Sequence, residues 1–301
     1  MSQWIERDKM TEDNSSFLNY VNSSGFAFQI RIEEEILKEP NRWQLAGREH
    51  RWQDESGQSG YIDLLVNFFG RLRVLIECKK QKDKNWIFLK TKSSQQKDGC
   101  SLLWSKKYKP INQMPFLADF AAWDIFSFSP TSYVSAFCTM QGQGDNTRTL
   151  LEKTASELTH AAECLAKEEL AFSAIKEFPH EKIYMPVIVT NATLTVCSFA
   201  PNNVNISTGE LSLENAEFET VPFIRFQKGL ETSILGTNIQ LGRQQDLELR
   251  DINAEKERTV FVVNSENLLD FLKNCSFLPD RNNMQFPWNS LDQIYYSFIV
   301  K

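Results

Sequence analysis

The sequence of 301 residues predicts a mixed α/β fold, in which a central sheet is flanked by helices and followed by C-terminal strand and helix extensions. Two strong apolar runs, 61–68 and 72–78, are separated by a three-residue connection containing Gly70, which is typical of a β-hairpin. A long helical pattern over 147–175 follows them in the chain. Helices and strands therefore alternate, and we expect one domain over residues 23–301.

The other elements are predicted from periodicity and from the residues that begin or end a helix or strand. Residues 1–22 are polar with little periodicity and are expected to form a short lead-in. A helix is expected over 26–37, because apolar residues recur at helical spacing before Pro40. Strands are predicted at 43–52, 133–140, 183–190, 192–199, 222–227 and 259–263, and a helix at 265–272. The stretches 211–220 and 242–258 are expected to be loops or partner-facing segments.

Composition excludes several classes of protein. With 42% apolar and 24% charged residues, the chain has an ordinary globular composition, and no apolar run approaches the roughly 18 residues of a membrane span. The N-terminus is polar and acidic where a signal peptide would be apolar, so we expect a cytoplasmic protein without membrane contact. Six dispersed cysteines without a C-x-x-C pair indicate reduced thiols, and the spacing of the three histidines does not favour a histidine metal site.

Charge is distributed unevenly along the chain. The net charge is −6, but residues 71–109 contain twelve basic and three acidic residues, so this segment carries +9 and the remainder −15. Such asymmetry predicts a basic surface set into an acidic body, as expected where a polyanion docks. Lys80, Lys82 and Lys84 are the candidate nucleic-acid-binding residues, and a solvated lysine-rich loop is the alternative.

Three charged residues stand out on the predicted hairpin. Side chains alternate across a strand, so Glu77 and Lys79 share a face. In a hairpin centred on Gly70, Asp63 lies opposite Glu77, with Cβ atoms roughly 5 Å apart. The flanking positions are apolar on both faces, which indicates interior strands where unpaired charge is costly. A divalent cation such as Mg²⁺ or Mn²⁺, together with Lys79, would compensate the two carboxylates. An ordinary cross-strand ion pair is the alternative.

A further acid is expected from the helix at 26–37. On a helical projection, Gln29 and Glu33 fall in the middle of the apolar arc, whereas Glu34 and Glu35 fall toward the other side. Buried polar groups usually have partners, and the site on the sheet could supply them. The alternatives are a surface position for Glu33 and an ordinary buried amide for Gln29.

A helix glutamate, then an Asp, then E-x-K on the following strand resembles the PD-(D/E)xK, or restriction-endonuclease-like, nuclease superfamily over residues 24–80. The resemblance implies that Asp63, Glu77 and the main-chain carbonyl of Cys78 hold Mg²⁺, that Glu33 contributes to the metal site, and that Lys79 assists the attack on phosphate. Ile62 stands where the Pro of the family name would be. Gln29 can also occupy the helix-acid position of some members.

These observations favour a metal-dependent nuclease that hydrolyses phosphodiester bonds, and we expect a DNA endonuclease. By analogy, such proteins often serve in bacterial restriction or antiphage defence. Two alternatives stay open: a noncatalytic nucleic-acid-binding or scaffold subunit of a larger complex, and a nuclease that acts on RNA. A protein partner or a homo-oligomer is compatible with both.

Overall fold

A ten-stranded mixed sheet forms the centre of the part of the chain that the computed structural model describes, namely residues 10–39, 43–68, 70–81, 84–93, 99–107, 122–141, 150–175, 180–230 and 256–279. The helices are α1 (Met10–Ser24), α2 (Phe26–Leu37), α3 (Leu150–Ile175) and α5 (Leu268–Asn274), and short 3₁₀ turns occur at Pro201–Asn203, Leu213–Asn215 and Ser265–Asn267. The strands are β1 (Gln44–Gln53), β2 (Ser59–Phe68), β3 (Leu72–Lys79), β4 (Asn85–Thr91), β5 (Gly99–Lys107), β6 (Ala122–Ser129), β7 (Val134–Ser135), β8 (Cys138–Met140), β9 (His180–Thr190), β10 (Thr193–Phe199), β11 (Ala216–Thr220), β12 (Phe223–Gly229), β13 (Glu257–Asn264) and β14 (Ser276–Pro279).

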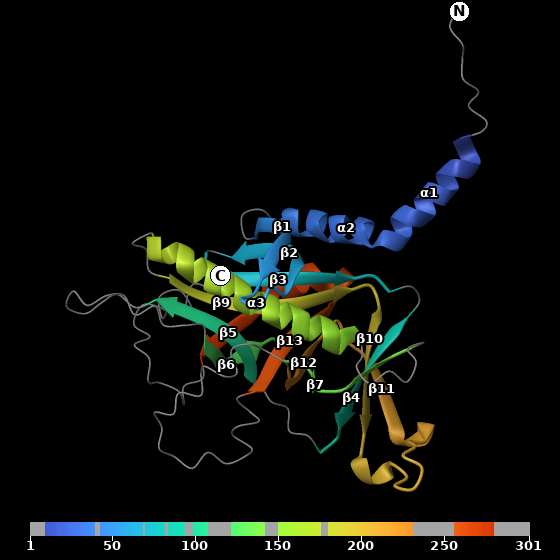
Figure 1. The fold of residues 1–301 in the computed structure, drawn as a ribbon. Helices are drawn as coiled ribbons and strands as arrows, with labels where there is room; N and C mark the ends of the chain where they lie inside the picture. Colours follow the sequence, from blue (N-terminus) through green and yellow to red (C-terminus); the bar gives the residue numbers. More distant parts are fainter. Residues whose placement is uncertain are drawn as a thin grey trace, which may run out of the picture.

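Strands β1, β2 and β3 form an antiparallel meander at one edge of the large sheet, and β9 pairs parallel with β3 (Figure 1). The order continues through β13, β12 and β7. Strand β5 pairs with both β9 and β6, and β6 also pairs with β14. A parallel pair needs a crossover connection, and the one between β3 and β9 includes α3.

A second, four-stranded sheet has the order β11–β10–β4–β8. Strands β3 and β9 run side by side as far as Lys79 and Thr190, and their continuations β4 and β10 are parallel neighbours in the second sheet. At the junction, the main-chain amide of Gln81 donates a hydrogen bond of 2.7 Å to Asn191 Oδ1. The end of β3 therefore lies where the two sheets diverge.

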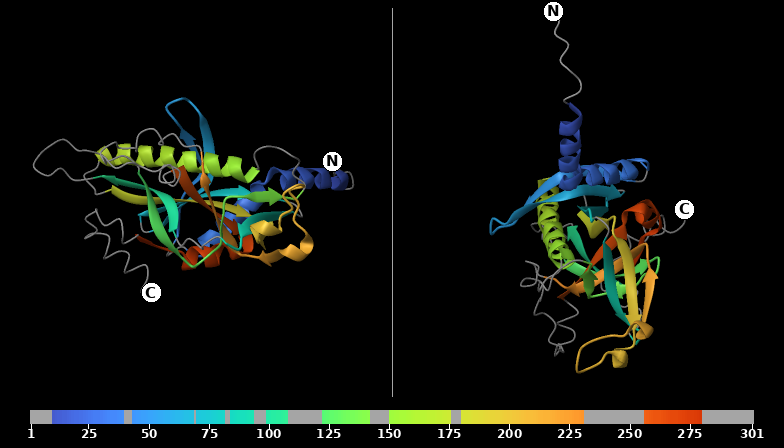
Figure 2. Two further views of the ribbon diagram at one scale, coloured as in Figure 1. Left: turned by 90° about the horizontal axis from the view of Figure 1, so that it is seen from below. Right: turned by 90° about the vertical axis from the view of Figure 1, so that its right-hand side faces the viewer.

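Two hydrophobic cores cover the two faces of the large sheet. Helix α3 packs in the core that contains Leu65 and Leu75, whereas α2 and α5 pack in the core that contains Leu64 and Ile76 (Figure 2). Alternating side chains of β2 and β3 are thus buried on both sides, as their nearly continuous apolar sequences predict. Each fully buried side chain of this size contributes about 1.5–3 kcal/mol.

The structure confirms a mixed α/β arrangement in which helices flank a large mixed sheet. The helix predicted at 26–37 and the hairpin strands are observed, as are the long helix predicted over 147–175, the strands predicted from 183 onward and the helix predicted at 265–272, with shifted ends. None of the six cysteines, all of which lie in the described residues, forms a disulfide. No helix among the described residues combines the length and the apolar character needed to cross a membrane.

Other expectations were wrong. The single strand predicted at 133–140 is two short strands, β7 and β8, which belong to different sheets. The stretch 211–220 contains β11, an exposed edge strand, because its main chain pairs with β10 although its side chains face solvent. Much of the expected lead-in, 1–22, belongs to α1. Of the predicted segment 242–258, residues 242–255 lie outside the described residues, and Glu257 and Arg258 begin β13.

Candidate functional site

The two carboxylates expected to face each other lie at the end of the β2–β3 ladder. The register follows the prediction, with Leu64 opposite Ile76 as the last pair before Asp63 and Glu77. Asp63 Oδ2 accepts a hydrogen bond of 2.7 Å from the main-chain amide of Cys78. The Asp63 carboxylate therefore reaches across to β3 and is fixed beside Glu77.

Lys79 lies on the same face as Glu77, as the alternation of a strand requires. Its Nζ donates a hydrogen bond of 2.7 Å to Glu77 Oε1. The side chains of Glu77 and Lys79 are 17% and 26% exposed, so this ion pair is partly shielded from water yet accessible. Two carboxylates and one ammonium group thus share one half-buried site.

This crowding changes the proton affinity of all three groups. Burial, followed by the charge of Asp63, raises the pKa of Glu77 to about 7. Burial also raises the pKa of Asp63, although the Cys78 amide and Lys79 oppose that effect. Burial alone would lower the pKa of Lys79, but the charge and hydrogen bond of Glu77, together with the charges of Asp63 and Glu157, outweigh burial and raise it. The site therefore favours a bound positive charge in addition to Lys79.

Gln29 of α2 lies beside these carboxylates. Its Nε2 donates one hydrogen bond of 2.6 Å to Glu49 Oε1 and another of 3.2 Å to the main-chain oxygen of Asp63. Helix α2 is thereby connected to β1 and β2 at the acidic site. The Gln29 amide therefore supports the main chain of Asp63 and connects it to a further acid, Glu49.

That further acid, Glu49 of β1, was not predicted from the sequence. It has a φ of 44°, in the left-handed region that non-glycine residues rarely adopt. The ladder between β1 and β2 shifts register between Leu45 and Gly47, so the simple alternation of β1 is broken just before it. The charge of Glu49 acts on Asp63 and raises its pKa. Gly47 within an apparent strand was the one signal in the sequence for such an irregularity.

Glu33 is the inward-facing member of its acidic triplet, as the helical phase predicted. The residue is 8% exposed, whereas Glu34 is exposed and Glu35 is half-buried. Both of its oxygens are bound by the guanidinium group of Arg48, with Nε–Oε2 at 2.6 Å and a second bond from Nη2 to Oε1. The hydrogen bond from Arg48 lowers the pKa of Glu33. The structure thus brings Glu33 to Arg48 and does not gather it with Asp63 and Glu77.

Some residues of the predicted basic surface have partners within the molecule, and others lie outside the described residues. Lys80 Nζ donates to the main-chain oxygen of Asn22 at 2.5 Å, away from Lys79. Lys84, which precedes β4, is half-buried, and Lys82 lies outside the described residues. Further basic residues of the segment pair with acids of other elements, Arg73 with Glu169 and Lys92 with Glu217.

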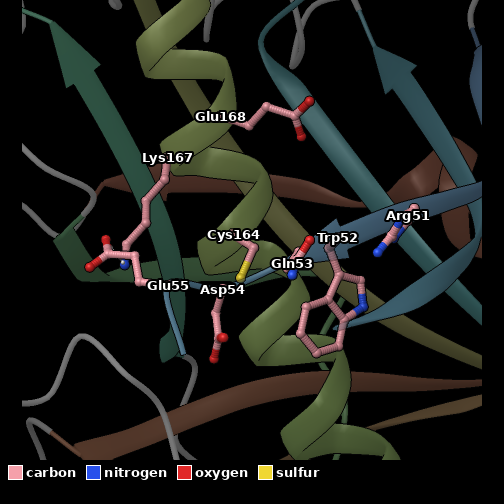
Figure 3. Close-up of a pocket in the computed structure, with 8 residues that line it drawn as sticks. All are labelled: Arg51, Trp52, Gln53, Asp54, Glu55, Cys164, Lys167 and Glu168. Atoms are coloured by element: carbon pink, nitrogen blue, oxygen red, sulfur yellow. Dashed lines mark ion pairs between the residues drawn. The ribbon is translucent and has the colours of Figure 1, made fainter. Parts of the chain in front are cut away.

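A small cavity of about 210 Å³ opens beside Glu77, between the end of the β1–β2 hairpin and helix α3. The hairpin contributes Trp52, Gln58, Ser59, Gly60 and Tyr61, and the helix contributes Thr154, Glu157, Leu158 and Ala161. A larger cavity of about 480 Å³ also borders Trp52, between β1 with its turn and a later part of α3 (Figure 3). Its walls carry both signs of charge, including Arg51, Lys167 and Glu168. The acid of the E-x-K strand borders the smaller cavity.

Among the described residues, no group of three or more His, Cys, Asp or Glu side chains is arranged to hold a metal ion. Any metal at Asp63 and Glu77 would therefore be held by two carboxylates, with main-chain, water or ligand oxygens completing its coordination. Comparisons of this chain with family models, with curated proteins and with solved structures found no match. The geometry of the site is thus the basis for its interpretation.

Proposed function

We propose that this chain is a metal-dependent nuclease that hydrolyses phosphodiester bonds, with DNA as its main substrate. The observation that carries the proposal is the meeting of Asp63, Glu77 and Lys79 in one half-buried, accessible site at the end of the β2–β3 hairpin. Burying like charges costs free energy, so a cluster of this kind on interior strands is more often functional than structural.

The donor chemistry fits Mg²⁺ or Mn²⁺. Mg²⁺ is commonly bound through one or two carboxylates and retains several waters or takes substrate phosphate oxygens. Asp63 and Glu77 supply the two carboxylates, and the Cys78 carbonyl is the expected main-chain ligand. When bound, the metal would activate water and neutralise charge on the attacked phosphate. The raised pKa values of Asp63 and Glu77 support the proposal, because burial, their main cause, penalises negative charge that a bound cation would compensate.

Lys79 would act on the substrate through its ammonium group. Its raised pKa keeps it charged at neutral pH, and the Glu77 carboxylate fixes its position. A preorganised positive charge near a phosphate stabilises the negative charge that develops during attack. Gln29 would hold the main chain of Asp63 in place through its 3.2 Å hydrogen bond.

The fold agrees in outline with the superfamily resemblance, since a mixed sheet flanked by helices bears the Asp and the E-x-K sequence on adjacent strands. We further propose, by analogy, a role in bacterial restriction or antiphage defence, and RNA as the alternative substrate. Glu33 is retained only as a positioning residue, because Arg48 binds both of its oxygens.

The test is an assay of purified protein with plasmid, linear and single-stranded DNA and with RNA, each in the presence of Mg²⁺, Mn²⁺ or EDTA. We expect DNA cleavage with either metal and none with EDTA. Cleavage that persists in EDTA, or no cleavage of any substrate with either metal, would contradict the proposal.

One observation favours the second candidate, a subunit of a larger complex. Helix α1 and the start of α2 expose large apolar side chains, among them Phe17, Leu18, Tyr20, Val21, Phe26 and Ile30, each more than half exposed. Such surfaces commonly mark contacts with other chains. A nuclease within an assembly would satisfy both observations, whereas a noncatalytic subunit would bind nucleic acid without metal-dependent cleavage.

A further inference from the structure

Helix α1 buries none of the side chains that the structure describes on it. Residues 14–24 are all exposed, and the helix extends away from the sheet (Figures 1 and 2). An isolated helix of about 15 residues is marginal in water, because most helical stability in proteins comes from packing of an apolar face. The four serines and three asparagines of α1 weaken it further, since both residue types compete for main-chain hydrogen bonds. The helical state of α1 therefore calls for a partner.

The large apolar residues of α1 form one face. At about 100° per residue, a single arc of about 160° holds Phe17, Leu18, Tyr20 and Val21. Each of these side chains is more than half exposed. The opposite side of the helix carries uncharged polar residues, namely Ser15, Ser16, Asn19 and Ser23. The helix is thus amphipathic, and its apolar face stays open to solvent in this chain.

The exposed apolar surface continues along α2. Phe26 and Ile30 lie about one helical turn apart there, and each is 60% exposed. Together with the four residues of α1 they expose on the order of 600 Å². Two copies that cover this surface would remove on the order of 1,200 Å² from water, which exceeds the roughly 1,000 Å² expected of a specific interface. A second copy therefore supplies enough area for a stable dimer.

The absence of charge selects the partner. Residues 14–30 contain no Asp, Glu, Lys or Arg, although 24% of the whole chain is charged. Nucleic acids and anionic membranes are bound through Lys and Arg, which this surface lacks. Copies of a chain with a net charge of −6 repel each other, and they do so least where the contacting surface is uncharged. An apolar, uncharged surface is also complementary to itself, as a two-fold interface requires.

We infer that α1 and the start of α2 form the interface of a homodimer, in which the apolar faces of two α1 helices pack together about a two-fold axis. The interface adjoins the candidate site, because Lys80 Nζ donates a hydrogen bond of 2.5 Å to the main-chain oxygen of Asn22 at the end of α1. The dimer does not depend on nuclease activity, since neither metal nor substrate takes part in the contact.

Sedimentation velocity of the full chain, from submicromolar to high micromolar concentrations, measures the dimer directly. Hydrogen exchange of the main-chain amides of residues 14–24 is recorded at both ends of that range. The variants are Phe17→Ser and Leu18→Ser. The matched controls are Phe172→Ser and Leu213→Ser, which remove exposed residues of the same types from other parts of the surface. All four residues are exposed within one chain, so the rest of the fold should form in each variant, which circular dichroism verifies.

We expect the wild type to sediment with twice the monomer mass of 34.8 kDa at high concentration and to dissociate on dilution. Phe17→Ser and Leu18→Ser should each raise the dissociation constant about thirtyfold, the scale of an interface hot spot. The two control variants should dimerise as the wild type does. Amides of α1 should exchange slowly in the dimer and rapidly after dilution, because the helix is stabilised by its partner.

Several outcomes would overturn the dimer. A wild-type chain that stays monomeric at the highest concentration would do so, and protected α1 amides in that monomer would mean that the same chain covers the helix. A dimer that neither α1 substitution weakens would place the interface elsewhere. Equal weakening by Phe17→Ser and Phe172→Ser would indicate nonspecific association of exposed aromatic residues. Binding of a monomeric wild type to phosphatidylcholine vesicles would assign the surface to a membrane instead.

Discussion

At the scale of single residues, the site is shaped by the cost of placing Glu77 next to Asp63. Burial and the neighbouring carboxylate raise the pKa of Glu77 to about 7, which means that its ionised form is less stable in the folded protein than in the unfolded chain. The ion pair with Lys79 offsets only part of that cost. The fold therefore retains a destabilising charge, as expected of a functional group rather than a structural one.

Glu77→Gln should accordingly stabilise the protein at pH 8, by on the order of 1 kcal/mol or more. The folded-state pKa of this acid is raised, so its cost is complete above about pH 7 and declines to nothing as the pH falls to the ordinary value of 4.5. Urea denaturation of both proteins at pH 8 and pH 5 measures this. A variant that is less stable than wild type at pH 8, or equally stabilised at both pH values, would contradict the inferred origin of the raised pKa.

Lys79→Ala should abolish cleavage while leaving the fold and the affinity for nucleic acid nearly intact. If its charge acts mainly on the transition state, its loss falls on the rate, by on the order of 3 kcal/mol or about a hundredfold or more. Lys80→Ala is the internal control, since Lys80 binds the Asn22 main chain and not the acidic site. The measurement is the rate at saturating DNA with Mg²⁺. A Lys79 variant that cuts at the wild-type rate, or equal loss of affinity in both variants, would point to a basic binding surface instead.

At the scale of helices and strands, those nearest the site were the easiest to predict. Strands β2 and β3 are buried on both faces, which leaves nearly continuous apolar runs in their sequences, and Gly70 marks the turn between them. The phase of α2 correctly placed Glu33 inward. Strands β4 and β5 were missed because lysines interrupt the apolar pattern of their segment.

Contacts between distant segments were not predictable from periodicity. Nothing in the phase of α2 indicates that Arg48 of β1 would bind Glu33, because that contact depends on how the helix packs on the sheet. Glu49 was missed for a related reason, since an irregular, left-handed residue follows no strand alternation. The sequence thus predicts which charges are buried more readily than which partners they find.

Helix α3 is tied to the sheet by a buried charge network centred on Glu169. Glu169 Oε1 accepts from Arg73 Nε at 2.8 Å and from Lys182 Nζ at 2.7 Å, and Oε2 accepts from the Tyr184 hydroxyl at 2.8 Å. Burial alone would raise the pKa of Glu169, but Arg73 and Lys182 together lower it. The network lies near the start of β3, whereas the acidic site lies at the other end of that strand.

Glu169→Gln should destabilise the protein by roughly 3 kcal/mol, because it leaves two largely buried cations without their carboxylate. Since the folded-state pKa of Glu169 is depressed, its contribution is complete above the ordinary value of 4.5 and is lost as the pH falls below it. The difference from wild type should therefore shrink in acid. Glu35→Gln is the control, because Glu35 pairs with two exposed partners, Arg31 and Lys38, and its loss should destabilise the protein far less. Thermal unfolding at pH 7 and pH 4 would test this, and similar effects of the two substitutions would contradict it.

At the scale of the whole molecule, some of the charge imbalance along the chain is offset by ion pairs between distant segments. Residues 71–109 carry +9 against −15 elsewhere, yet Arg73 and Lys92 pair with acids far along the chain, Glu169 and Glu217. These two basic residues therefore connect their strands to other elements. Divalent cations will also associate weakly and without specificity with the acidic remainder of the chain. A test for the metal site therefore has to distinguish specific binding from this nonspecific association.

Mg²⁺ should raise the unfolding temperature of the wild-type protein, because a ligand that binds the folded state alone stabilises it by RT ln(1 + [L]/Kd), about 2.7 kcal/mol at a hundredfold excess over Kd. Asp63→Asn should remove most of this increase. Asp270→Asn, which removes the same charge from α5, should retain it. The Asp63 variant should also be more stable than wild type without metal, since burial and Glu49 raise the pKa of the carboxyl group that it replaces.

Thermal unfolding with Mg²⁺ from zero to several millimolar, with K⁺ added to hold ionic strength constant, distinguishes binding at Asp63 and Glu77 from binding to the acidic surface. An equal increase in all three proteins would mean that Mg²⁺ acts through the acidic surface as a whole, and the metal site between Asp63 and Glu77 would have to be given up.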